Sequence, residues 1–219
     1  MAVTMAEITK LRKISGAGMM DCKNALTEAN GDIDKAMEII RKKGQAVAAK
    51  RSDREASEGC VLAKSTGQFA AIIALKCETD FVAKNADFAE YVAEVANQAL
   101  TTEAADIDAF MKEAWKSEPT KTVEEALAGK IAVIGENLKI RRFERVAIDN
   151  GCVVSYIHGA GRIGVLVAAE GASGDAVKEA LTNIAMQIAA MNPEYISRND
   201  MSADELAKLR EIIVDSALN

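Results

Sequence analysis

The chain has 219 residues, of which 49% are hydrophobic and 27% charged, and its formal net charge is −6. This composition is typical of a globular protein with one large domain or two to three small ones. The longest uninterrupted apolar run, AAIIAL, is far shorter than the roughly 18 residues that a membrane-spanning helix needs. The N-terminus also lacks the apolar segment of a secretory signal. We therefore expect a cytoplasmic protein without a membrane partner.

Residues 1–44 contain the apolar periodicity of three short helices. Ile8 and Leu11 are three residues apart in the first helix, and Gly16 follows it. The second ends at Asn30-Gly31, and Asp32 is a good N-cap for the third. Residues 45–58 are small and charged without an apolar stripe, and we expect a linker there, helical in part. The sequence thus predicts a small helical bundle followed by a linker.

From residue 59 the pattern changes to strands and then returns to helices. Two apolar runs separated by Ser65-Thr66-Gly67 predict a β-hairpin, and helices are expected at about 82–100 and 106–115. A capping box, Thr122 to Glu125, predicts a further helix. This segment, residues 59–138, is expected to be one α+β unit.

Three strand-like runs follow, at about 137–148, 151–159 and 164–171. Arg141 and Arg142 in the first run suggest an edge strand or an exposed face. Ser173 is expected to cap the next helix, and a capping box from Ser202 to Glu205 predicts the last one. The whole pattern predicts an α+β fold with antiparallel sheets flanked by helices.

The segment GAGRIG, residues 159–164, matches the GxGxxG phosphate-binding pattern in its letters. That pattern binds a dinucleotide only where the glycines lead into a helix whose N-terminus meets the pyrophosphate. Here the apolar, β-branched run VLVAAEG follows instead. We interpret the glycines as the turn of a hairpin and predict no nucleotide cofactor.

Residues suited to catalysis or metal binding are sparse. His158 is the only histidine, and Ser155 lies three positions before it on a predicted strand, so the two side chains should point to opposite faces. The four cysteines are scattered without a CxxC motif, which predicts reduced thiols and no zinc site: Cys22, Cys60, Cys77 and Cys152. We therefore predict no enzyme activity, no catalytic site, no cofactor and no bound metal.

Charge is unevenly distributed along the sequence. Residues 1–54 carry 11 Lys and Arg against 7 Asp and Glu, whereas the remainder carries 16 against 26. The basic stretches Arg41–Lys43 and Lys50–Arg51 lack accompanying aromatic residues, which favours a solvated helix face over nucleic-acid binding. The asymmetry suits an acidic protein surface as partner. A ribosome-associated RNA-binding protein remains a further alternative.

Two groups of apolar residues occupy unusual positions. Met19 and Met20 follow a Gly-rich bend, and Phe81 follows Asp80 at a polar corner between a strand and a helix. Each has two interpretations. The methionines are either an ordinary helix-start staple or an adaptable binding surface, and Phe81 either packs against the first turn of the next helix or projects toward a partner.

The segments KLRKISGAGMMDCKNALTEANGDIDKAMEIIRKKG, TDFVAKN and YIHGAGRIGVLVAAEG together closely resemble bacterial elongation factor Ts. The resemblance implies an N-terminal ubiquitin-associated-like three-helix domain over 1–44, a linker over 45–58, and a core of two related subdomains over 59–138 and 139–219. Members of the family usually continue beyond this point, so we expect a sequence truncated at its C-terminus, with an incomplete second subdomain. Whether the protein self-associates is left open.

The resemblance also implies a function, that of a guanine-nucleotide exchange factor for the translation GTPase elongation factor Tu. The implied contacts with that partner are a loop pushed toward its magnesium and phosphate site and residues of the N-terminal domain and the core: Thr79, Asp80, Phe81, Val82, Arg12, Met19, Met20, Ile134, Gly135 and His158. The alternative is a ubiquitin-associated-like binding module on an inert α+β scaffold, which would have no need of the TDF loop, Thr79-Asp80-Phe81.

Overall fold

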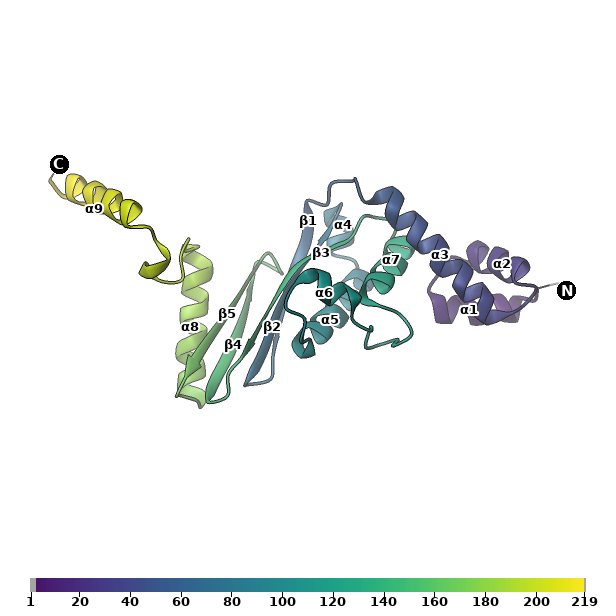
Figure 1. The fold of residues 1–219 in the computed structure, drawn as a ribbon, viewed down its shortest axis with the longest axis horizontal. Coiled ribbons are helices and arrows are strands. Elements are labelled where there is room, and N and C mark those ends of the chain that lie inside the picture. The colour runs from purple at the N-terminus through teal and green to yellow at the C-terminus, as the bar shows by residue number, and fades with distance from the viewer. Residues whose placement is uncertain (1–2, 219) are drawn as a thin grey trace.

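The structure, a computed structural model, describes residues 3–218. Over this range the protein forms nine α-helices, one 3-10 helix and five strands. Figure 1 shows an elongated molecule with a helical bundle at one end, two sheets with their helices in the middle, and the last helix at the other end. The prediction of an α+β fold with antiparallel sheets is confirmed.

The N-terminal bundle consists of α1 (Met5–Ser15), α2 (Met19–Glu28) and α3 (Ile33–Arg51). Gly16 ends α1 in the left-handed conformation, with φ of 68°, which glycine adopts without steric cost. Asp32 caps α3 as predicted, because its side chain accepts hydrogen bonds from the backbone N–H groups of residues 34 and 35. The buried side chains between the three helices include Ile8, Leu11, Cys22, Leu26 and Ala36.

Helix α3 continues well beyond the bundle, to Arg51, so the first half of the predicted linker is helical. It packs there on α7 (Val123–Ile134). The two helices are close at Gly44 of α3, which is buried: a Cβ placed on it would be in van der Waals contact with α7, at 3.5 Å from the carbonyl oxygen of Ala128. One helix therefore belongs to both the bundle and the core. The division into domains at 44, 58 and 138 stays a prediction.

The first sheet has the strand order β1 (Glu58–Ser65), β2 (Phe69–Cys77) and β3 (Lys139–Ala147), all antiparallel. The prediction that the strand with Arg141 and Arg142 lies at an edge is confirmed. The sequence places this strand in the second subdomain, whereas the structure pairs it with β2, from Phe69 opposite Ala147 onward. It therefore completes the first sheet.

One face of this sheet is covered by α5 (Ala86–Thr101), with α6 (Ile107–Lys112) and α7 beside it. The helix predicted over 82–100 is in fact two, because α4 (Asp80–Ala83) ends at Lys84 and Asn85 caps α5. The main core lies between sheet and helices. Its largest side chains include Ile73, Leu75, Phe88, Tyr91, Phe110 and Trp115.

The second sheet is a hairpin of β4 (Gly151–His158) and β5 (Ile163–Glu170), and GAGRIG supplies its turn, as predicted. Helix α8 (Asp175–Met191) covers one face of the hairpin. The other face lies so close to β1 and β2 that a Cβ on Gly164 would fall 2.5 Å from Val61. Gly174 precedes α8 without a side-chain cap, so the expectation that Ser173 caps it was wrong.

The described part of the protein ends with a 3-10 helix, η1 (Arg198–Asp200), and α9 (Ala203–Leu218). The Ser202–Glu205 capping box at the start of α9 is present as predicted. In Figure 1, α9 (yellow) lies apart from the rest of the molecule. Among the described residues, no helix is long and apolar enough to span a membrane.

Candidate partner-binding site

The TDF loop follows β2 at the corner where the sheet gives way to helices. Thr79 caps α4, because its side-chain oxygen accepts a hydrogen bond from the backbone N–H of Val82 at 3.3 Å. Phe81 lies in this single helical turn with 83% of its surface exposed, whereas Val82 packs partly against the core. The interpretation in which Phe81 tucks against the next helix is therefore wrong. Its ring projects into solvent.

A fixed charge accompanies this ring. The Asp80 carboxylate pairs with the Lys84 ammonium at 2.7 Å, one turn further along the helix. The hydrogen bond from Lys84 and its positive charge lower the pKa of the Asp80 carboxyl group. Asp80 is thus ionised at neutral pH, and the loop presents an apolar ring beside a carboxylate.

The base of the loop is held by Glu136, a residue that the sequence did not single out. Its carboxylate accepts hydrogen bonds from the backbone N–H groups of Glu78 at 3.0 Å and Thr79 at 3.1 Å. It also accepts the hydroxyl hydrogen of Thr79, with 2.6 Å between the oxygens. No local pattern could have indicated this contact, because the partners are 57 and 58 positions apart.

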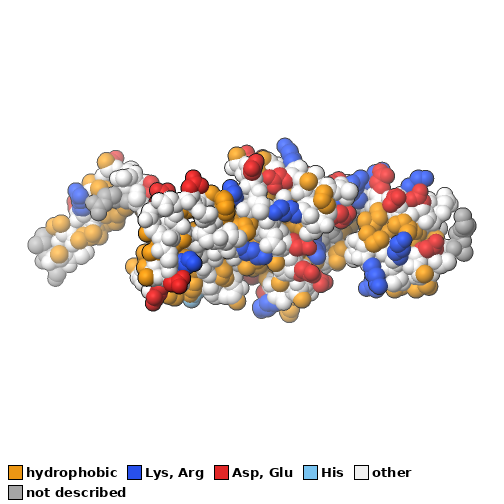
Figure 2. Space-filling view, turned by 90° about the horizontal axis from the view of Figure 1, so that it is seen from below, with side chains coloured by type: hydrophobic (Ala, Val, Ile, Leu, Met, Phe, Trp, Pro, Cys, Tyr) orange, Lys and Arg blue, Asp and Glu red, His pale blue; other side chains and the backbone are white. Residues whose placement is uncertain are grey.

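Met19 and Met20 open α2 and are 43% and 63% exposed. Arg12 is also exposed, in the last turn of α1. Neither methionine belongs to the bundle core, so the structure does not support the interpretation of an ordinary helix-start staple. In Figure 2 the N-terminal bundle shows a hydrophobic patch bordered by side chains of both charges.

Ile134 and Gly135 form the end of α7, where Gly135 terminates the helix with φ of 86°. The residues on either side of this pair in the sequence contact different parts of the molecule. Val133, half exposed, lies near the bundle, because a Cβ on Gly16 would be 3.7 Å from its side chain. On the other side, Glu136 holds the TDF loop. Ile134 and Gly135 therefore stand in the sequence between a residue near the bundle and one that holds the loop, and Ile134 is partly buried against the main core.

His158 lies elsewhere, at the end of β4 on the second sheet, and is exposed. Its Nδ1 is 3.0 Å from the Tyr156 hydroxyl, and the turn that follows packs against β1, where the backbone N–H of Val61 donates to the carbonyl of Gly161 at 2.6 Å. His158 therefore belongs to a different sheet from the TDF loop. Its contact with a partner remains a prediction.

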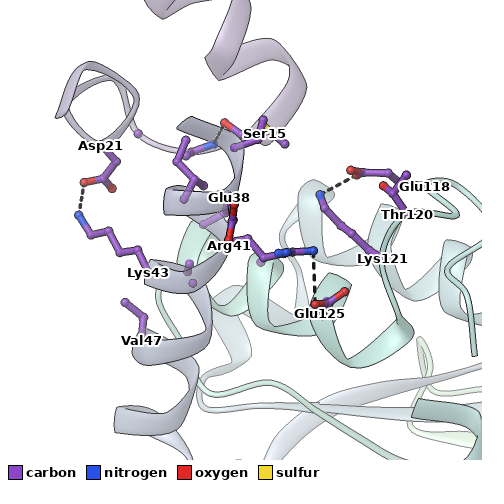
Figure 3. A pocket seen from close by; sticks show the side chains of 18 of the residues that line it. Ser15, Asp21, Glu38, Arg41, Lys43, Val47, Glu118, Thr120, Lys121 and Glu125 are labelled. Carbon is purple, nitrogen blue, oxygen red and sulfur yellow. Dashed lines mark hydrogen bonds and ion pairs between the residues drawn. The ribbon is translucent and has the colours of Figure 1, made fainter. Parts of the chain in front are cut away.

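A cavity of about 350 Å³ is lined by residues of the bundle, of α7 and of the segment that precedes α7. Figure 3 shows ion pairs along its walls, from Lys43 to Asp21 within the bundle and from Arg41 to Glu125 of α7 at 3.6 Å. Lys121 pairs with Glu118 at 2.6 Å. Each of these three cations is thus paired with a carboxylate of the protein. The cavity lies where the bundle meets the core.

The four cysteines are free, as predicted, and three of them are buried. Burial, reinforced by the nearby charge of Glu136, raises the pKa of the Cys77 thiol to about 11. Within residues 3–218, no group of three or more His, Cys, Asp or Glu side chains is arranged to hold a metal ion.

These features define a class of protein: an α+β scaffold that presents exposed apolar side chains on a braced loop and at the start of a helix, each beside charged residues, an arrangement suited to contact with another macromolecule. The comparisons with known proteins specify the family. The family model described as "Elongation factor TS" matches residues 78–219. The chain belongs to the elongation factor Ts family.

Similarity to relatives extends over nearly the whole sequence. The chain is 46% identical to an elongation factor Ts of Clostridium kluyveri. The aligned region includes 99% of the chain and 72% of the Clostridium protein. The chain is 53% identical to one of Phocaeicola vulgatus over 98% of its length, covering 62% of that protein. The resemblance inferred from three short segments is thereby confirmed.

Proposed function

We propose that this protein is a guanine-nucleotide exchange factor that binds elongation factor Tu and promotes release of its GDP. It would do so by inserting the Asp80-Phe81 tip near the magnesium and phosphate site of the GTPase. The exchange requires no bond-making chemistry and no cofactor of its own. The proposal includes a cytoplasmic location, where translation takes place.

The observation that carries the proposal is the exposed ring of Phe81 on a braced loop. A folded protein gains little from leaving one of five phenylalanines in water, whereas a ring held out beside a carboxylate can enter a pocket of a partner. The alternative of a simple binding module accounts for the N-terminal bundle. It leaves the TDF loop without a role.

The physics of the exchange is reciprocal. Magnesium that bridges phosphate oxygens is among the strongest charges in a nucleotide site, so displacing its supporting groups weakens nucleotide binding. Lowering the affinity for GDP about 1,000-fold requires a coupling free energy of about 4 kcal/mol. Because coupling acts equally in both directions, nucleotide must weaken binding of the exchange factor by the same factor. Excess nucleotide then releases the factor.

The surfaces around the loop would supply the binding energy. Arg12, Met19 and Met20 are exposed on the bundle, and Ile134 and Gly135 end α7 directly before Glu136, which holds the loop. A contact that spans these groups would engage both the bundle and the core. We assign His158 to the same partner on the resemblance alone.

The test is co-purification of the protein with elongation factor Tu, followed by addition of excess GDP. We expect a stable complex without nucleotide and its dissociation by GDP, together with faster release of a fluorescent GDP analogue when the protein is added. A complex that forms but neither responds to GDP nor speeds release would support the binding-module alternative. Absence of a complex would refute the proposal.

A further inference from the structure

The segment that follows α7 contacts two parts of the molecule at once. Gly135, Glu136 and Asn137 form a tight corner between α7 and β3. On one side this corner meets the base of the TDF loop, and on the other the turn that follows α3. Both neighbours are far from it in sequence.

The contact with the loop is reciprocal. The Glu136 carboxylate receives three hydrogen bonds from Glu78 and Thr79, and in return the backbone N–H of Asn137 donates to the Glu78 carboxylate at 2.6 Å. Hydrogen bonds to an ionised carboxylate are among the stronger ones in proteins. The pair Glu78-Thr79 and the pair Glu136-Asn137 therefore hold each other in place.

The contact with α3 passes through the same corner. Asn137 is only 2% exposed, and its side-chain amide donates to the backbone carbonyls of Arg54 at 2.7 Å and Ser52 at 3.4 Å. The Arg54 guanidinium is also 3.6 Å from the Glu78 carboxylate. The turn that directly follows α3, the corner and the loop are therefore one hydrogen-bonded unit.

We propose that Glu136 and Asn137 are positioning residues for exchange. They fix the Asp80-Phe81 tip relative to α3, and so relative to the Met19-Met20 surface that α3 carries with the bundle. This inference rests on the proposed function. Binding energy gained at the methionines can act on the nucleotide site only if the Asp80-Phe81 tip keeps its position. A loose loop would have to be ordered in each encounter, and this ordering would cost part of the binding free energy.

The proposal predicts that loss of Glu136 lowers the maximal rate of GDP release much more than it weakens binding to the GTPase. Glu136→Ala removes the acceptor for all three loop hydrogen bonds and leaves the exposed contact residues in place. We expect the maximal rate of GDP release to fall about tenfold, while the concentration of exchange factor at half-maximal rate changes less than threefold. Thr79→Val, which removes the hydroxyl group that joins Glu136 to the helix cap, should act in the same direction, and Thr79→Ser should restore the rate.

Hydrogen exchange of the free protein gives a second readout that needs no partner. The amides of Glu78 and Thr79 should lose protection in Glu136→Ala and keep much of it in Glu136→Gln, whose amide oxygen can still accept. Glu124→Ala, on the exposed side of α7, is the matched control and should change neither protection nor rate. Circular dichroism establishes that each variant is folded, and the Gln and Thr79 variants provide the test if the Ala variant is not.

The outcomes separate the two proposals. A wild-type protein that does not speed GDP release refutes the proposed function and this inference with it. An active wild-type protein whose folded Glu136 variants lose loop protection but keep the full rate overturns the positioning role alone. A half-maximal concentration that rises about tenfold while the maximal rate stays unchanged would also overturn it, because that result would indicate a residue that acts through binding alone.

Discussion

Phe81 in α4 and Phe88 in the first turn of α5 stand in opposite environments, although they are close in sequence: 83% of the first side chain is exposed, and the second is completely buried in the main core. The same residue type therefore serves two purposes within one short stretch. The pair also provides a matched experiment.

We predict that Phe81→Ala leaves the free energy of unfolding within about 0.5 kcal/mol of the wild type, as is usual for surface positions. It should slow GDP release from elongation factor Tu at least tenfold. Phe88→Ala should instead cost about 3–5 kcal/mol of stability, because it empties a buried site. Urea denaturation and release of fluorescent GDP measure the two effects. Wild-type release by folded Phe81→Ala would contradict the proposed role of the ring.

A second prediction concerns the methionine surface of the bundle. Replacing Met19 and Met20 together with Ser should weaken binding to elongation factor Tu about tenfold or more, because two exposed apolar contacts are lost. The fold should be unaffected, since neither side chain enters the bundle core. Met191→Ser, at a 68% exposed position on α8, is the control. Unchanged affinity of the double variant in calorimetry would remove this surface from the interface.

A third prediction addresses the crossing of α3 and α7. Gly44 is helical and buried, and a Cβ there would meet Ala128 and Gly129 only at ordinary contact distances of 3.5 and 3.7 Å. Gly44→Ala should therefore stabilise the protein by about 0.5–1 kcal/mol through helix propensity. Gly44→Leu should destabilise it by about 1–3 kcal/mol, because the larger side chain forces the helices apart. Thermal unfolding of both variants measures the difference, and equal melting temperatures would contradict the close packing.

A fourth prediction follows from the buried thiol of Cys77. Its pKa is raised from 9.0 in a free thiol to about 11 in the folded protein. Below pH 9 both states keep the proton, and between pH 9 and 11 only the unfolded state releases it. The free energy of unfolding should therefore fall as the pH rises through this range. Cys77→Ala should show a shallower decline in urea titrations at about pH 8.5, 9.5 and 10.5; an identical slope would refute the raised pKa.

Periodic and capped elements could be predicted from the sequence because their determinants are local. The bundle helices, the Thr122–Glu125 and Ser202–Glu205 boxes and the hairpin turn at Gly159–Gly161 all depend on residues within one or two turns. The full extent of α3 could not be predicted, for the opposite reason. Residues 45–51 have no apolar stripe of their own, and their helix is supported by packing on α7.

The candidate site divides in the same way. Its tip, Asp80-Phe81, stood out as an aromatic residue at a polar corner, but its exposure depends on what the neighbouring helices leave uncovered. Its support could not be predicted. Glu136 and Asn137 act on residues some 57 to 85 positions away, and one sequence contains no signal for such a distant hydrogen bond.

Helix α3 has a consequence for how the two contact surfaces would work together. Its 19 residues span about 28 Å without a break, packed on the bundle at one end and on α7 at the other. A flexible tether would let the second surface search a volume, with an effective concentration that falls as the tether lengthens. A helical strut instead presents both surfaces at a single spacing. The protein would then bind with both surfaces at once only to a partner whose two matching sites are separated by that distance. Partners with another spacing would engage one surface at a time.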